Sequence, residues 1–62
     1  MEYWLKRGFT IKGTRNQNIW IVSRNGRHAV VTVDFWDNWE RTSEWFGTVE
    51  RAESETRELA NV

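Results

Sequence analysis

Few residues of this chain could carry out covalent chemistry. The 62 residues include one histidine and no cysteine. His28 follows Ser23 across a short turn at Asn25-Gly26, and a Ser–His contact is half of a nucleophilic pair. A two-residue turn would place these side chains opposite each other in any hairpin, so strand pairing alone explains the contact. We therefore expect no enzymatic activity.

Three carboxylates recur at every third position of the segment DFWDNWE, at Asp34, Asp37 and Glu40. Carboxylate oxygens are the ligands that hard cations such as Ca²⁺ prefer. Asp37 and Asn38, however, have the residue types of a tight turn, and that turn would set Asp34 opposite Arg41. Turn formation and an ion pair account for these acids. We therefore expect neither a metal ion nor another cofactor.

The basic residues form the leading candidate for a binding surface. Arg24 and Arg27 flank the Asn25-Gly26 turn, where they would face each other and repel mildly. Arginines neutralise phosphates, and an exposed β-ribbon can enter the DNA major groove. In the alternative interpretation, the hairpin tip is basic and polar simply because it is exposed to solvent, and it binds nothing. The residues predicted to contact nucleic acid are Lys12, Arg15, Arg24, Asn25, Arg27 and His28.

Aromatic side chains beside acids form a second candidate surface. The segment DFWDNWERTSEWFG, residues 34–47, contains three Trp and two Phe. Exposed Trp is typical of the hot spots of protein interfaces, so Trp36, Trp39 and Glu40 are candidate contacts for a protein partner. In the alternative interpretation, Trp36 and Trp39 pair across the turn and only stabilise the fold.

Charge is divided unevenly along the chain. Residues 1–28 carry six Lys or Arg and one acid, whereas residues 29–62 carry three Arg and eight acids. A positive and a negative pole allow self-association as well as binding of a partner. No apolar run approaches the roughly 20 residues of a membrane span. The first residues lack a signal-peptide pattern, and the absence of cysteine fits a reducing compartment, so we expect a cytoplasmic protein without a membrane partner.

These candidate surfaces must be positioned by one small domain, residues 1–62. The runs NIWIVSR and RHAVVTVDF flank Asn25-Gly26, whose residue types favour a type I′ turn and pair Trp20 with Val31. Both faces of the resulting hairpin are apolar, although a solvated antiparallel sheet normally has one polar face. A helix can cover only one of them. A partner or a second copy of the chain could cover the other.

Flanking segments complete the predicted fold. GFTIKGT and ERTSEWFG predict strands before and after the hairpin, and EYWLK either extends the first strand or packs across a sheet edge. TVERAESETRELANV predicts a helix over residues 48–60, capped by Thr48 and resting on a floor of tryptophans. The predicted fold class is α+β: an antiparallel three- to four-stranded β-meander, with strands between residues 3 and 46, packed by one C-terminal α-helix.

The segments NIWIVSRNGRHAV and EWFGTVERAESETRELA resemble two related DNA-binding patterns. Over residues 8–60 the chain is similar to the AP2 domain and to the N-terminal arm-binding domains of phage-type integrases. In those families a three-stranded sheet packs on a C-terminal helix and lies in the major groove. Trp20 resembles the strand aromatic, Gly47-Thr48 the turn before the helix, and Glu50 with Ala52 the helix start. VTVDFWDNWERTSE is longer and more acidic than its counterpart there, so the resemblance implies contact through the basic hairpin only.

Two functional hypotheses follow. In the first, the chain is a small non-catalytic nucleic-acid-binding module, such as a phage- or plasmid-type accessory or regulatory protein, that uses its basic hairpin. In the second, it is a small inhibitor or adaptor that binds a protein through the aromatic and acidic corner. Phosphate binding should weaken steeply with salt, whereas an aromatic-anchored protein contact should not.

Overall fold

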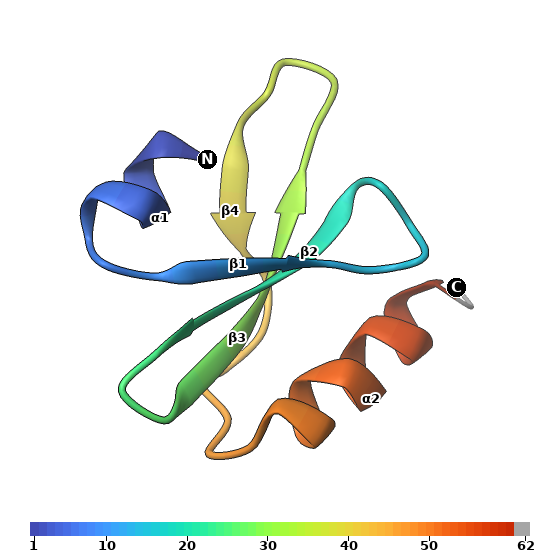
Figure 1. Ribbon diagram of the computed structural model, residues 1–62. Coiled ribbons are helices and arrows are strands. Elements are labelled where there is room, and N and C mark those ends of the chain that lie inside the picture. The colour runs from blue at the N-terminus through green and yellow to red at the C-terminus, as the bar shows by residue number, and fades with distance from the viewer. Residues whose placement is uncertain (61–62) are drawn as a thin grey trace.

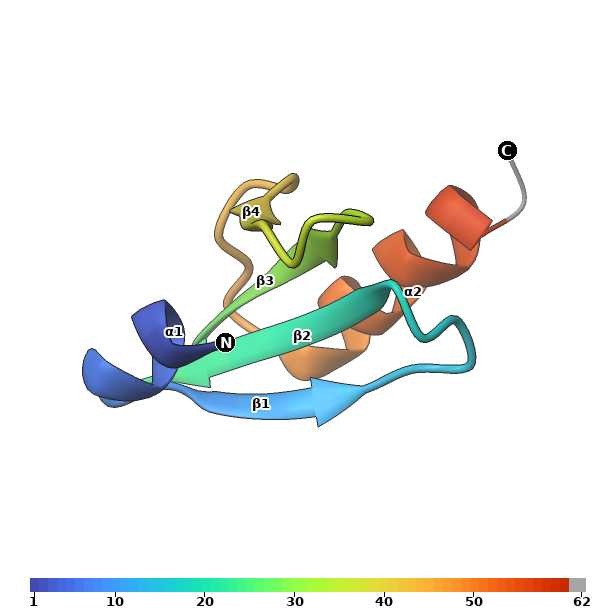
Figure 2. The same ribbon diagram turned by 90° about the horizontal axis from the view of Figure 1, so that it is seen from above.

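Four antiparallel strands form one sheet in the order of the chain, with a helix toward each end (Figures 1 and 2). The computed structural model describes residues 1–60, so the last two residues of the predicted domain lie outside the described residues. The elements are α1 Glu2–Lys6, β1 Thr10–Gly13, β2 Ile19–Arg24, β3 Arg27–Val33, β4 Trp39–Arg41 and α2 Val49–Ala60. The predicted fold class, an α+β β-meander with a C-terminal helix, is confirmed.

The central hairpin of β2 and β3 has the predicted register. Arg24 pairs with Arg27, and the same register continues to the far ends of both strands. Asn25 and Gly26 have φ angles of 51° and 76°, the left-handed values that a type I′ turn needs at both central positions. The Asn-Gly pair therefore sets which residues of β2 and β3 share a face.

Helix α2 packs against a largely aliphatic face of the sheet. The prediction that it packs against tryptophans is wrong. The small side chain of Ala52 is fully buried, which lets α2 approach β2 and β3 closely. Strand alternation sends the bulky indole of Trp20 to the other face. The cluster under α2 consists of Ile19, Ile21, Val30, Phe46 and Ala52, with Leu59 packed against it.

The chain's own aromatic residues cover the opposite face. Residues 2–6, which were predicted as strand or edge packing, form the short helix α1 instead, and Trp4 from this helix is buried on the sheet. The cluster on this face consists of Trp4, Val22, Ala29 and Val31, with Phe9, Ile11, Trp39 and Trp45 packed against it. Coverage by a partner or a second copy is not needed to bury this face.

A loop at residues 34–38 joins β3 to β4, and the two-residue turn predicted at Asp37-Asn38 is wrong. The Asp34 carboxylate accepts hydrogen bonds from the backbone N–H groups of Trp36 (2.8 Å) and Asn38 (2.9 Å). Asp37 takes a left-handed φ of 63°. Side-chain bonds from Asp34 therefore build a wider turn than two residues can make.

This wider turn changes the pairing that the sequence predicted. Trp39 pairs with Val33, so Trp36 does not lie beside Trp39 as predicted. Arg41 pairs with Val31, so the predicted pair of Asp34 and Arg41 is also wrong.

The strand predicted over residues 40–47 is short and interrupted. β4 ends at Arg41, and the chain rejoins the sheet in a single bridge between Phe46 and His28. Between them, the buried Ser43 hydroxyl accepts a hydrogen bond from the Val30 backbone N–H at 2.8 Å. A side chain therefore replaces a backbone partner at the centre of β3. Within residues 1–60, no helix has the length and apolar character needed to cross a membrane.

Candidate nucleic-acid interface

Arg24 and Arg27 lie at the hairpin end of the sheet, on the face opposite α2. The guanidinium carbon of Arg24 lies 5.9 Å from the centroid of the Phe9 ring. That of Arg27 lies 5.6 Å from the centroid of the Trp45 ring. The two predicted contact residues are therefore held over aromatic rings, at distances typical of cation–π interactions.

A third arginine, Arg41 of β4, joins them. Its guanidinium carbon lies 5.3 Å from the Trp45 centroid, and its Nη1 donates a hydrogen bond to the Ser43 carbonyl. The Phe9 and Trp45 rings beneath the arginines stack on each other with their centroids 5.6 Å apart. We call Arg24, Arg27 and Arg41 the arginine cluster.

The arginine cluster has no ion-pair partner among residues 1–60. Its three side chains belong to exposed residues. Within residues 1–60 the one ion pair joins Lys12 to Glu53 (3.4 Å), so no described carboxylate neutralises the cluster. Three like charges at one end of a sheet produce a local positive potential that attracts anions.

Neither a metal site nor a known relative gives a further indication of function. In the part of the chain that the structure describes, no group of three or more His, Cys, Asp or Glu side chains could hold a metal ion. Comparison of the chain with protein-family models, curated proteins and solved structures found no match. The functional interpretation therefore depends on the geometry of the chain itself.

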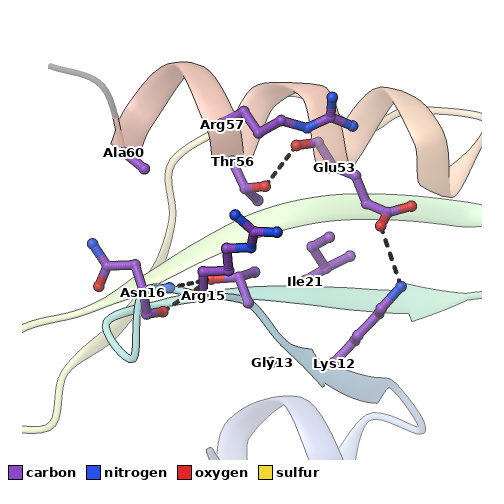
Figure 3. Close-up of a pocket in the computed structure, with 10 residues that line it drawn as sticks. Lys12, Gly13, Arg15, Asn16, Ile21, Glu53, Thr56, Arg57 and Ala60 are labelled. Atoms are coloured by element: carbon purple, nitrogen blue, oxygen red, sulfur yellow. Dashed lines mark hydrogen bonds and ion pairs between the residues drawn. The ribbon is translucent and has the colours of Figure 1, made fainter.

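Lys12 and Arg15, which were predicted to extend the basic track, lie away from the arginine cluster. Lys12 is opposite Ile21 in the sheet, on the face that α2 covers, and it bonds to Glu53 of α2. Both residues line a groove of about 890 Å³ between β1, the loop after it and the C-terminal half of α2 (Figure 3). We call this the basic groove, and Arg57 of α2 also lines it.

The remaining predicted contacts divide between the two faces. Asn25 is exposed at the hairpin tip, beside the arginine cluster. His28 alternates with Arg27 along β3 and lies half-buried on the α2 side, where its Nδ1 is 2.6 Å from the Ser23 hydroxyl. This Ser–His contact follows from the register, as predicted, and no carboxylate in residues 1–60 bonds to His28 as a triad would require.

Trp36, Trp39 and Glu40, which were predicted to form a protein-binding surface, do not form one continuous aromatic surface. Trp39 is half-buried against Trp20 with centroids 5.5 Å apart, and its indole N–H donates to Asp37 at 2.9 Å. Trp36 is 77% exposed, and Phe35 beside it is 91% exposed. Glu40 is also exposed. The two rings available to a partner are therefore those of Phe35 and Trp36, and Phe35 was not predicted.

Sequence reasoning also missed Arg41, Phe9 and Trp45 at the arginine cluster. Each lies far along the chain from the hairpin, and only the pairing of β3 with β4 and the path of the chain after Ser43 bring Arg41 and Trp45 there. Alternation along β4 could not reveal them, because the predicted pairing of Arg41 with Asp34 places the Arg41 side chain on the other face of the sheet, away from Arg27.

Proposed function

We propose that this chain is a non-catalytic nucleic-acid-binding module whose arginine cluster contacts backbone phosphates. The observation that carries the proposal is the convergence of Arg24, Arg27 and Arg41 without a carboxylate partner in residues 1–60. The planar guanidinium group matches phosphate geometry and forms two parallel hydrogen bonds with it.

The aromatic rings under the cluster support this proposal because they limit the movement of the arginines. An unsupported arginine loses much rotamer freedom when it binds. Here Arg24 rests on Phe9, and Arg27 and Arg41 share Trp45. A surface that is already ordered binds an anion at a smaller entropic cost.

The position of α1 limits which part of the sheet could meet a duplex. Trp4 is buried on the face opposite α2, so α1 occupies part of that face. The hairpin turn lies at the end of the sheet where Arg24, Asn25 and Arg27 are all exposed. Contact through this end positions phosphates rather than reading bases, so we expect weak dependence on DNA sequence.

The test is a titration of a fluorescently labelled random-sequence DNA duplex, followed by anisotropy at low salt and at about 0.2 M salt. We expect affinity to fall steeply with salt. The double variant Arg24→Gln/Arg27→Gln should lower the slope of log affinity against log salt by about two, because each lost phosphate contact removes about 0.9.

Arg51→Gln provides the matched control. Arg51 is also exposed and its guanidinium carbon lies 5.5 Å from the centroid of an aromatic ring, that of Phe46, but it belongs to α2. The control should bind like the wild type. No binding at low salt, or an equal loss in Arg51→Gln and the hairpin variant, would reject the arginine cluster as the nucleic-acid site.

A further inference from the structure

Two adjacent aromatic side chains extend into solvent at the loop between β3 and β4. Phe35 is 91% exposed and Trp36 is 77% exposed, more than any other large hydrophobic residue among residues 1–60. Their rings contact each other edge to face, with centroids 5.3 Å apart. Large apolar side chains that are exposed side by side mark interaction sites more often than isolated ones do.

The loop holds these rings in a defined position. We call residues 34–38 the aromatic loop. Asp34 and Asn38 are joined by a backbone hydrogen bond of 3.1 Å, and the Asn38 side chain donates to Asp34 at 3.2 Å. A second backbone bond, from Asp37 to Asp34, closes the turn at 3.1 Å. A preordered loop loses little conformational entropy when it docks.

The aromatic loop carries negative charge on both sides of the rings. Asp34 precedes Phe35 and Asp37 follows Trp36. Neither carboxylate forms an ion pair in the described part of the chain. The loop therefore complements a surface that combines apolar contacts with unpaired cations.

The basic groove is such a surface. The exposed Ala60 contributes apolar surface at its edge, the buried Ile21 lies at its base, and Figure 3 shows Arg15 rising from the loop after β1 toward α2. Glu53 is engaged by Lys12, which leaves Arg15 and Arg57 without an ion-pair partner in residues 1–60. The groove has a volume of about 890 Å³ and is open to solvent on one side.

We propose that the chain self-associates by inserting the aromatic loop of one copy into the basic groove of a second copy. The loop and the groove lie at the same end of the sheet, because the Val33 backbone N–H donates to the Asn18 carbonyl at 2.9 Å. This bond ties the start of the aromatic loop to the segment that follows the groove residues of β1. Two copies related by a two-fold axis can therefore each insert an aromatic loop into the basic groove of the other. Such a dimer leaves no loop or groove unoccupied.

The expected dimer is weak. A buried aromatic side chain contributes about 150–250 Å², so four rings bury roughly 600–1,000 Å². Stable interfaces bury about 1,200–2,000 Å² in total. The remaining buried area of this dimer must come from polar residues around the rings. Arg24 and Arg27 flank the turn that precedes β3, whereas the aromatic loop follows the end of β3, so self-association does not depend on nucleic-acid binding.

Sedimentation velocity of the full chain, from micromolar to millimolar concentration and without nucleic acid, tests the proposal. The wild type should shift from monomer to dimer, less so at high salt. The indole N–H resonance of Trp36 should move over the same concentrations. A loop variant, Phe35→Ser/Trp36→Ser, and a groove variant, Arg15→Glu/Arg57→Glu, should each stay monomeric. All four side chains are exposed, so both variants should fold.

Leu5→Ser and Arg51→Glu are the matched controls, because they remove an exposed apolar group and reverse an exposed charge elsewhere. Both should dimerise like the wild type. Mixing the loop variant with the groove variant should restore part of the association, since one intact loop then meets one intact groove. A wild type that stays monomeric at every concentration, a groove variant that dimerises normally, or a mixture that fails to associate would each overturn the proposal.

Discussion

Arg27 and Arg41 come from different strands and lie over the same indole, with guanidinium carbons 5.6 Å and 5.3 Å from the centroid of Trp45. Two cations share this ring although no described carboxylate stands between them. The mutual repulsion of the arginines is opposed by the ring and by the bond from Arg41 to the Ser43 carbonyl. Trp45 therefore connects the hydrophobic core to the charged surface.

Trp45→Leu should weaken both the fold and nucleic-acid binding. Trp45 packs on the buried cluster around Trp4, so its loss should lower the free energy of unfolding by about 1–3 kcal/mol. Loss of the ring should also free Arg27 and Arg41 and reduce DNA affinity. Urea unfolding and the anisotropy titration measure the two effects.

Trp20→Leu is the control for this prediction. Trp20 is also partly buried but packs on Trp39, away from the arginine cluster. We expect this control to lower stability and to leave the affinity of the remaining folded protein unchanged. An equal loss of affinity in both variants would show that Trp45 acts only through stability.

The central hairpin could be predicted because its determinants are local. Asn25 and Gly26 adopt the left-handed backbone that their residue types tolerate, and this turn alone fixes every pair between β2 and β3. The cap of α2 was local too, since the Thr48 hydroxyl accepts from the Arg51 backbone N–H at 3.4 Å.

The arginine cluster could be predicted only in part, because its completion depends on one turn. The predicted turn paired Asp34 with Arg41, whereas Arg41 pairs with Val31, three positions earlier. An odd shift of register moves a side chain to the other face of a sheet. The carboxylate bonds of Asp34 that cause this shift cannot be recognised from residue types alone.

The choice of faces could not be predicted for a different reason. Alternation showed two apolar faces but gave no indication of which one α2 would cover. The answer depends on Trp4, which occupies the second face from a helix of five residues. A helix this short has too few turns to show a helical pattern and forms because of its tertiary contact.

The aromatic loop should respond to acid through Asp34. The pKa of this carboxyl lies below its ordinary 3.8, chiefly because the Asn38 backbone N–H donates to it, with further bonds from the Asn38 side chain and the Trp36 backbone. Because the pKa is lower in the folded state, the ionised carboxylate stabilises the loop at any pH above the ordinary pKa of the carboxyl. This stabilisation is lost as the pH falls through the folded-state pKa. The backbone amide shifts of Trp36 and Asn38 should therefore titrate with a midpoint below 3.8.

The variant Asp34→Asn distinguishes the titration of Asp34 from that of the other acids of the chain. The variant keeps one oxygen that can accept the two backbone bonds from Trp36 and Asn38, but its side chain cannot ionise. Its Trp36 and Asn38 amide shifts should stay constant over the pH range where those of the wild type move. A wild-type midpoint at or above 3.8, or an unchanged titration in the variant, would contradict the assignment.

Ser43→Ala should destabilise the centre of the sheet. The Ser43 hydroxyl is the acceptor for the Val30 backbone N–H, and Val30 is completely buried. Removing the hydroxyl leaves a buried donor unpaired, which costs about 1–3 kcal/mol. Hydrogen exchange should accelerate at the Val30 amide, and the urea midpoint should fall.

Thr42→Ala gives the comparison for Ser43→Ala. Its hydroxyl lies 3.5 Å from the Val30 carbonyl at an exposed position, and that carbonyl already accepts a bond from the Thr42 backbone N–H at 3.0 Å. We expect a change within about 0.5 kcal/mol. Equal midpoints for the two variants would show that the Ser43 hydroxyl is not the partner of Val30.

Ala52→Leu should separate α2 from the sheet. Ala52 has no exposed surface and lies among Ile19, Ile21, Val30 and Phe46, so a larger side chain has no room without displacement of the helix. Overpacking of this kind costs about 1–3 kcal/mol, a large part of the stability of so small a domain. Ser54→Leu, at an exposed position of the same helix, adds a similar apolar side chain without crowding and should change the stability by less than about 0.5 kcal/mol. Thermal unfolding followed by circular dichroism compares the two, and a midpoint for Ala52→Leu equal to that of Ser54→Leu would mean that α2 does not dock through Ala52.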